Sequence, residues 1–112
     1  MGHRVSATHV GTISQRLETV GSATVATTLQ ALATPSRLRI LAELVEGPCA
    51  AGALAERAGL ETSACSHQLR ILRNLSLVEA ERDGRSMIYR LADQHVADLI
   101  EQAIGHSEHQ RS

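Results

Sequence analysis

The stretch AAGALAERAGLETSACSHQLRILRNL, residues 50–75, decides the fold of this 112-residue chain. A short helix is predicted over residues 50–58, and Gly59 ends it because glycine tolerates the left-handed conformation of a helix C-cap. A second helix is predicted over residues 63–75, where apolar residues recur at helical spacing. Two short helices joined by a tight, glycine-containing turn indicate a helix-turn-helix.

The sequence before this stretch predicts two further helices. Helical spacing of apolar residues extends over residues 14–33, where Gly21 is expected to interrupt or soften the helix. Thr34-Pro35 then starts a new helix, because Thr34 can cap free amides and proline is tolerated at the first helical position. This helix is expected to stop at Gly47-Pro48.

The sequence after residue 75 changes from helical to alternating periodicity. Residues 77–82 and 86–91 flank Asp83-Gly84, a dipeptide that favours a tight hairpin turn. Asp93 is then expected to cap a last helix that runs to about His109. The predicted order, ααααββα, is that of a mainly α winged helix-turn-helix. It spans residues 14–110, behind a flexible N-terminal arm of residues 1–13.

Composition predicts a soluble cytoplasmic homodimer. The chain holds one Tyr and neither Trp nor Phe, so its core must consist of Ala, Leu, Ile and Val. Such a core is marginal for this length, and we expect the terminal helices to bury further apolar surface in a dimer. Two cysteines make no disulfide framework of the secreted type, and no apolar run is long enough for a membrane span.

The second helix of the pair is polar on one side, as a DNA-reading helix is. The net charge of −1 gives no overall electrostatic argument for binding to nucleic acid, so the prediction of DNA binding depends on where the charges lie. Gln68 could read adenine through paired hydrogen bonds, and Arg70 could read guanine or bind a phosphate. Arg82 and Arg85 flank the hairpin turn, where a wing touches the DNA backbone or minor groove. The predicted DNA-binding residues are Thr62, Ser63, Ser66, His67, Gln68, Arg70, Arg73, Arg82 and Arg85.

Histidines on the last helix predict a metal site shared by two chains. At about 100° per residue, His95, His106 and His109 lie within about 60° of one another on the helix surface. His95 and His106 are separated by about 16 Å along the axis, at about 1.5 Å per residue. One helix therefore cannot bring them to one ion, whereas two antiparallel copies can. Asp93 and His95 of one chain would meet His106 and His109 of the other, in two symmetric sites suited to Zn, Ni or Co.

Three segments resemble the ArsR/SmtB family of metal-responsive repressors. They are LQALATPSRL (29–38), SACSHQLRILRNL (63–75) and DGRSMIY (83–89), and the resemblance covers residues 24–110. The spacing of Asp93 and His95 with His106 and His109 is that of the family's C-terminal-helix site. The resemblance implies an apo dimer that represses an operator with inverted-repeat symmetry, and metal binding that releases it to switch on an efflux or resistance gene.

Within the family, the chain is most similar to the nickel/cobalt sensors. His109 stands where zinc sensors often have Glu, and the chain opens with Met1-Gly2-His3. Once Met1 is removed, the α-amine of Gly2 and the imidazole of His3 could complete a six-coordinate shell, which favours Ni(II) or Co(II) over tetrahedral Zn(II).

Two alternatives stay open within this fold, and an enzyme is not expected. The first is a Zn(II)-responsive repressor. The second is a thiol-based or metal-independent regulator that would use Cys49 and Cys65. Because the family's Cys-x-Cys pair is absent around Cys49, a thiolate-rich site for cadmium, lead or arsenite is not expected. No histidine or nucleophile motif of a known enzyme class is present.

Overall fold

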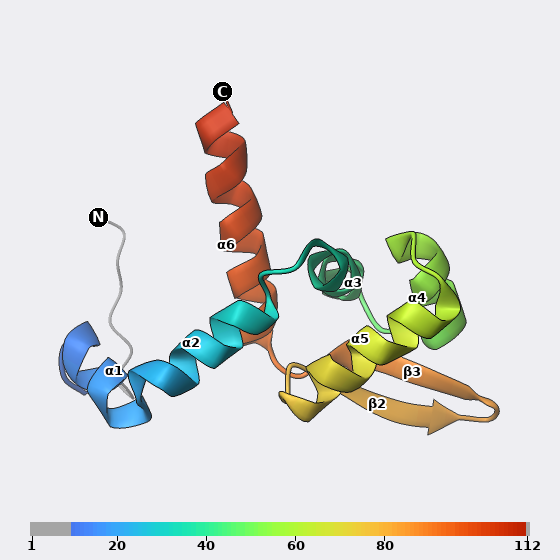
Figure 1. Ribbon diagram of the computed structural model, residues 1–112, viewed down its shortest axis with the longest axis horizontal. Coiled ribbons are helices and arrows are strands. Elements are labelled where there is room, and N and C mark those ends of the chain that lie inside the picture. The colour runs from blue at the N-terminus through green and yellow to red at the C-terminus, as the bar shows by residue number, and fades with distance from the viewer. Residues whose placement is uncertain (1–9, 112) are drawn as a thin grey trace. The chain divides into compact units, whose positions relative to one another are not determined.

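The computed structural model describes residues 10–111, and the chain divides into two compact units, residues 1–30 and 31–112. Its elements are α1 (Ile13–Val20), α2 (Ser22–Ala31), α3 (Pro35–Val45), β1 (Cys49–Ala50), α4 (Ala51–Ala58), α5 (Thr62–Asn74), β2 (Val78–Asp83), β3 (Ser86–Leu91) and α6 (Gln94–Arg111). Figure 1 shows this order.

The first unit contains two helices where one was expected. Thr12 accepts a hydrogen bond from the backbone of Gln15 and the Gln15 side chain accepts one from the backbone of Thr12, which is a capping box. Gly21 has a φ of 102°, outside the helical range, and it separates α1 from α2. Of the interruption or softening expected at Gly21, the structure shows the interruption, because glycine adopts this conformation without a Cβ clash. No residue of α1 is buried.

The second unit begins with the predicted start signal of α3. The Thr34 hydroxyl accepts a hydrogen bond from the Arg37 backbone N–H at 3.4 Å, and Pro35 is the first helical residue. The helix ends before Gly47-Pro48, as predicted. Gly59 ends α4 at a φ of 71° in the left-handed region. The helix boundaries predicted from these residues are confirmed.

A short third strand, β1, was missed. Cys49 and Ala50 pair antiparallel with Tyr89 and Ile88 of β3, so the sheet order is β1-β3-β2. Two residues are too short to show an alternating pattern, and their partner strand lies about 40 residues further along the chain. The strand joins the beginning of α4 to the middle of β3.

The hairpin is confirmed, but its turn is shifted by one residue. Asp83 still pairs with Ser86 in the ladder between β2 and β3, so the two loop residues are Gly84 and Arg85. Gly84 has a φ of 64°. Gly84 is the first of the two loop residues, which is the position where a type II′ turn requires glycine. A loop made of Asp83 and Gly84 would have placed it second.

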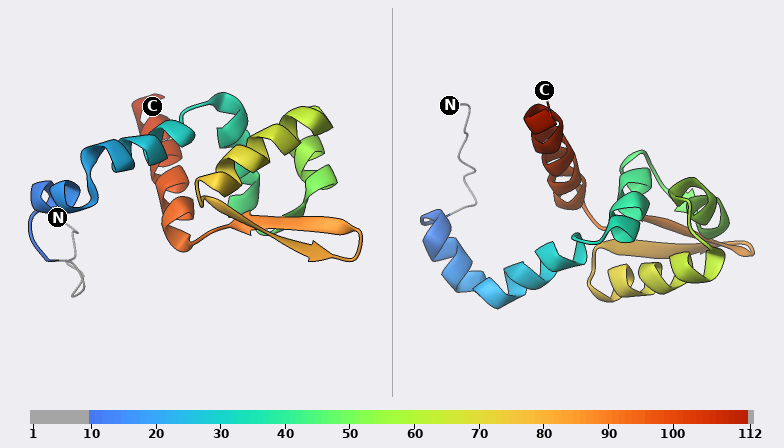
Figure 2. Two further views of the ribbon diagram at one scale, coloured as in Figure 1. Left: turned by 60° about the horizontal axis from the view of Figure 1, so that its bottom comes forward. Right: turned by 45° about the horizontal axis from the view of Figure 1, so that its top comes forward.

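Helices α4 and α5 pack on each other and form the helix-turn-helix. The hairpin tip projects beyond both helices in Figures 1 and 2. Figure 2 also shows α6 as one uninterrupted helix that follows β3. As predicted, Asp93 caps it: the Asp93 Oδ1 accepts a hydrogen bond from the Val96 backbone N–H at 3.2 Å.

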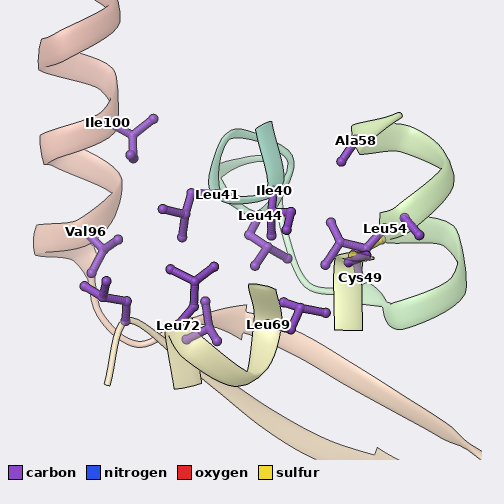
Figure 3. Packing of buried hydrophobic residues seen from close by; sticks show 14 of the residues in the cluster. Ile40, Leu41, Leu44, Cys49, Leu54, Ala58, Leu69, Leu72, Val96 and Ile100 are labelled. Atoms are coloured by element: carbon purple, nitrogen blue, oxygen red, sulfur yellow. The ribbon is translucent and has the colours of Figure 1, made fainter. Parts of the chain in front are cut away.

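The core of the second unit consists mainly of aliphatic side chains, as the composition predicted, together with Cys49 and Cys65. In Figure 3, residues of α3, α4, α5 and α6 point toward one another around Leu41 and Leu72. Both of these side chains are fully buried. Only the first half of α6 joins this cluster, through Val96 and Ile100, whereas all ten residues from Glu101 to Gln110 are exposed.

In the described part of the chain, no helix combines the length and the apolar character needed to cross a membrane.

Candidate nucleic-acid interface and metal-binding helix

Helix α5 has a buried face and an exposed face. Cys65, Leu69 and Leu72 are buried against the core. All but one of the predicted DNA-reading residues on this helix are exposed, and Gln68 is half-buried. The exposed residues are Thr62, Ser63, Ser66, His67, Arg70 and Arg73.

The exposed face of α5 is cationic although the whole chain is not. The helix contains Arg70 and Arg73 and neither Asp nor Glu, in a protein of net charge −1. A positive face on a slightly acidic protein is a local electrostatic feature, and local charge determines where a phosphate backbone can approach.

The hairpin separates one arginine, paired with two glutamates, from a tip that carries two arginines and Asp83. Arg90 lies 3.0 Å from Glu81 and 3.5 Å from Glu79, and the hydrogen bond and charge of Glu81, with Glu79, raise the pKa of Arg90. Both of the predicted wing arginines, Arg82 and Arg85, are exposed at the other end of the hairpin. The tip can therefore offer two guanidinium groups to DNA, with Asp83 beside them, while Glu79 and Glu81 of β2 are paired with Arg90.

One residue at this surface was missed in the sequence. Arg37 of α3 donates a hydrogen bond from Nη1 to the Gln68 Oε1 at 3.4 Å. The two residues are 31 positions apart, so no local spacing could have paired them. Arg37 belongs to the segment that carries the family resemblance, and this was the only signal.

At the start of α6, the first pair of predicted metal ligands is already together. The His95 Nδ1 lies 3.6 Å from the Asp93 Oδ1, and both side chains are mostly exposed, at 91% and 55%. The same Asp93 oxygen accepts the capping hydrogen bond from Val96, which fixes the carboxylate at the helix start.

The second pair, His106 and His109, lies in the exposed second half of α6. Its two residues are three positions apart, so they share a face of the helix. Within residues 10–111, no three His, Cys, Asp or Glu side chains of one chain are grouped so that they could hold a metal ion. The structure thus places the predicted ligands in two separate pairs. The other two predicted ligands, Gly2 and His3, lie outside the described residues.

The donor set of the two pairs fits a transition metal. Imidazole nitrogens with one carboxylate oxygen form a borderline ligand set that suits Ni, Co and Zn. Because the pairs are exposed and fixed on one rigid helix, they can be completed from outside by a second molecule without any rearrangement of the core.

Of the two cysteines, Cys65 lacks the surroundings of a redox sensor, whereas the Cys49 sulfur accepts a hydrogen bond from Arg57 Nη1 at 3.7 Å. Both are unpaired and buried. Burial raises the pKa of the Cys65 thiol, with a smaller contribution from Cys49. A buried, protonated thiol reacts slowly with oxidants and electrophiles. This observation argues against a thiol switch that depends on Cys65.

Comparison with known proteins identifies several relatives. A helix-turn-helix domain model matches residues 32–81. The transcriptional regulator NmtR of Mycobacterium tuberculosis is 55% identical over 109 residues, which is 97% of this chain and 89% of NmtR. The solution structure of apo-NmtR matches with a TM-score of 0.69 at 53% identity, over 96% of this chain and 89% of that one.

Two further relatives extend the comparison. A transcriptional repressor SmtB homolog of Synechocystis is 45% identical over 76 residues, 68% of this chain and 58% of that protein. A homodimeric winged helix-turn-helix DNA-binding domain from Mycobacterium bovis, described as a possible ArsR-family regulator, matches with a TM-score of 0.72 at 30% identity. The match covers 93% of this chain and 96% of the Mycobacterium bovis chain. All of these relatives are transcriptional regulators, in agreement with the expectation that the chain is not an enzyme.

Proposed function

The chain belongs to the ArsR/SmtB family of winged helix-turn-helix transcriptional regulators, and from this premise we propose that it is a repressor released from DNA by Ni(II) or Co(II). As an apo homodimer it binds an operator with inverted-repeat symmetry. Metal binding between the two α6 helices weakens this binding and switches on a gene for metal efflux or resistance.

The observation that carries the proposal is the division of the ligands on α6 into two pairs. Asp93 and His95 lie at the start of the helix, and His106 and His109 lie about 16 Å or more further along its axis, at about 1.5 Å per residue. An antiparallel second copy brings the first pair of one chain to the second pair of the other. Each dimer then has two identical sites, and a metal ion bound there links the protomers.

Exposed apolar residues on the terminal helices support the dimer. In α1, Ile13 is 74% exposed and Val20 is 58% exposed, although both are large hydrophobic residues. In α6, Leu99 and Ile104 are also exposed. Surface of this kind is stabilised by burial against another copy. The homodimeric Mycobacterium bovis relative shows that this fold forms such assemblies.

On DNA, each wing and each α5 has a separate role. The exposed face of α5 enters the major groove, where Gln68 and Arg70 contact base edges. Short hydroxyl side chains at its amino end and Arg73 bind the sugar-phosphate backbone. Arg82 and Arg85 bind the backbone or the minor groove at the hairpin tip.

The choice of nickel or cobalt over zinc depends on ligand number. Asp93, His95, His106 and His109 supply four ligands, which is enough for tetrahedral Zn(II). Gly2 and His3 would add an amine and an imidazole, and six nitrogen and oxygen ligands favour Ni(II) or Co(II). The similarity to NmtR over nearly the whole chain supports this assignment.

Operator binding measured against each metal tests the proposal. We expect Ni(II) and Co(II) to weaken operator binding at concentrations where Zn(II) has a smaller effect. Deletion of Gly2 and His3 should remove this preference and leave apo binding unchanged. If Zn(II) releases the operator as effectively as Ni(II) and the deletion has no effect, the chain is a zinc sensor. Strong visible absorption bands of the Co(II) form would lead to the same conclusion, because they indicate four-coordination.

A further inference from the structure

Arg37 links the start of α3 to the base-reading face of α5. Its backbone N–H is fixed by the Thr34 cap at the first turn of α3. Its guanidinium Nη1 donates to the side-chain oxygen of Gln68 at 3.4 Å, and the bond lies in a half-buried position between the two helices.

This contact determines which end of the Gln68 amide faces α3. An arginine side chain has five N–H donors and no acceptor, so the amide must turn its oxygen toward Arg37 and its NH2 group away. Glutamine by itself can flip between two orientations that have almost the same shape. Arg37 removes this ambiguity.

Stability alone does not account for an arginine at this place. The Arg37 Nε is buried and has no hydrogen-bond partner in the described part of the chain. A buried donor without a partner destabilises the fold. The bond to Gln68 is also long compared with the usual N–H···O distance of about 2.9 Å, so its contribution to stability is small.

We propose that Arg37 is a positioning residue that orients Gln68 to donate to the operator, so that Gln68 recognises an acceptor-bearing base edge. This inference rests on the proposed role of α5 in reading the operator. The acceptors in the major groove are O6 and N7 of guanine, N7 of adenine and O4 of thymine. Paired recognition of adenine, the interpretation that the sequence suggested, needs both ends of the amide, and here the oxygen end is held by Arg37.

The test compares base discrimination in four variants of the full chain. The probe is an operator duplex selected from random DNA with the wild-type apo protein, together with a set of duplexes in which each base pair is replaced in turn. The variants are Gln68→Ala, Arg37→Met, the double variant, and Arg39→Met. Arg39 is the matched control because it lies two residues further along α3 and donates to the Ala58 carbonyl at 2.9 Å, not to α5.

We expect Gln68→Ala to lose discrimination at one base pair in each half-site. Arg37→Met should reduce discrimination at that same pair by about 5-fold or more, the lower range for one good base contact, and leave the other pairs unchanged. The double variant should match Gln68→Ala, because a positioning residue has no effect once its partner is gone. Arg39→Met should leave the pattern intact.

Four outcomes would overturn the inference. Arg37→Met could weaken binding to all duplexes equally, which would mean a phosphate contact. The effects of Arg37→Met and Gln68→Ala could add in the double variant. Arg39→Met could change the pattern as Arg37→Met does. Removal of the exocyclic amino group of an adenine in the operator could abolish the base discrimination that depends on Gln68. This would mean that the Gln68 amide oxygen accepts from that adenine and is not held by Arg37. If Gln68→Ala changes nothing, it is the proposed placement of α5 that fails.

A second variant keeps the inference testable if Arg37→Met does not fold. In Gln68→Glu the carboxylate accepts from Arg37 and has no NH2 group to present, so base discrimination should fall as far as in Gln68→Ala. A new preference for cytosine, whose N4 amino group can donate to a carboxylate, would show that this side chain faces the DNA with its oxygens. That result would contradict the positioning role.

Discussion

Helices α5 and α6 carry the two halves of the proposed function, and they differ in how complete their surfaces are within one chain. Helix α5 buries three side chains in the core, and these hold its exposed face in place. Helix α6 contributes buried side chains only from its first half, and its ligand residues lie in two pairs that one chain cannot join.

The difference shows which part of the protein can act as a switch. A reading surface must be rigid before it meets DNA, and α5 meets this condition within a single chain. A sensing surface must change the arrangement of two protomers, so its ligands are useful when they belong to different chains. The comparison predicts that changes in α6 alter the response to metal and changes in α5 alter recognition of DNA.

The largest expected effect is that of His106→Ala. Removal of one imidazole from each shared site should abolish metal-driven release from the operator, while apo binding stays close to wild type. Operator titrations with and without Ni(II) measure both quantities. Glu101→Ala, an exposed change on another face of α6, is the control and should keep the response. Continued release by metal in His106→Ala would favour a metal-independent regulator or another site.

The next effect concerns the reading surface itself. Arg70→Ala should weaken binding to the operator by about 10-fold or more and reduce the preference over random DNA. Arg85→Ala should weaken binding to all sequences alike and lower the slope of affinity against salt by about 1. Fluorescence anisotropy at several salt concentrations distinguishes the two. Unchanged affinity in both variants would mean that the DNA surface lies elsewhere.

A third comparison contrasts apolar residues of the two helices. Leu72 of α5 is fully buried, and Leu72→Ala should lower the free energy of unfolding by about 2–5 kcal/mol. Leu99 of α6 is 40% exposed in the single chain, so Leu99→Ala should chiefly raise the dissociation constant of the dimer. Denaturant titration and sedimentation measure these effects. A dimer unaffected by Leu99→Ala would remove this face of α6 from the interface.

The smallest expected effect lies at the end of α5. Ser76 has a φ of 61°, a left-handed conformation that is strained for a residue with a Cβ. Ser76→Gly should relieve this strain and raise the free energy of unfolding by about 0.5 kcal/mol, after allowance for the greater chain entropy of glycine. Thermal unfolding measures it, with Asn74→Gly, a helical position where glycine should destabilise, as the opposite control. A lower melting temperature for Ser76→Gly would show that the hydroxyl has a role of its own.

The sequence predicted the features that depend on neighbouring residues. Thr34 with Pro35, Gly59 and Asp93 mark helix ends through local hydrogen bonds or local backbone freedom, and all four act as expected. The alternation of apolar residues in β2 and β3 likewise predicted the hairpin. Its turn was shifted because Asp83 completes the last pair of the ladder.

The features that were missed depend on contacts between distant residues. Strand β1 exists because Cys49 meets Tyr89, and Arg37 meets Gln68 across two helices. Neither pairing leaves a periodic pattern in the sequence. The metal ligands differ from both of these groups. Their spacing on one helix could be predicted from the sequence, but the site that they form depends on a second chain.

A complementation experiment tests most directly the central claim that the sensor lies between two chains. One variant carries Asp93→Ala and His95→Ala, and the other carries His106→Ala and His109→Ala. Each variant alone should bind no metal at the helix site. When the two are mixed and allowed to exchange subunits, each mixed dimer should regain about one intact site, in which Asp93 and His95 of one chain meet His106 and His109 of the other. Metal binding that does not return in the mixture, or that persists in either variant alone, would contradict a site shared between chains.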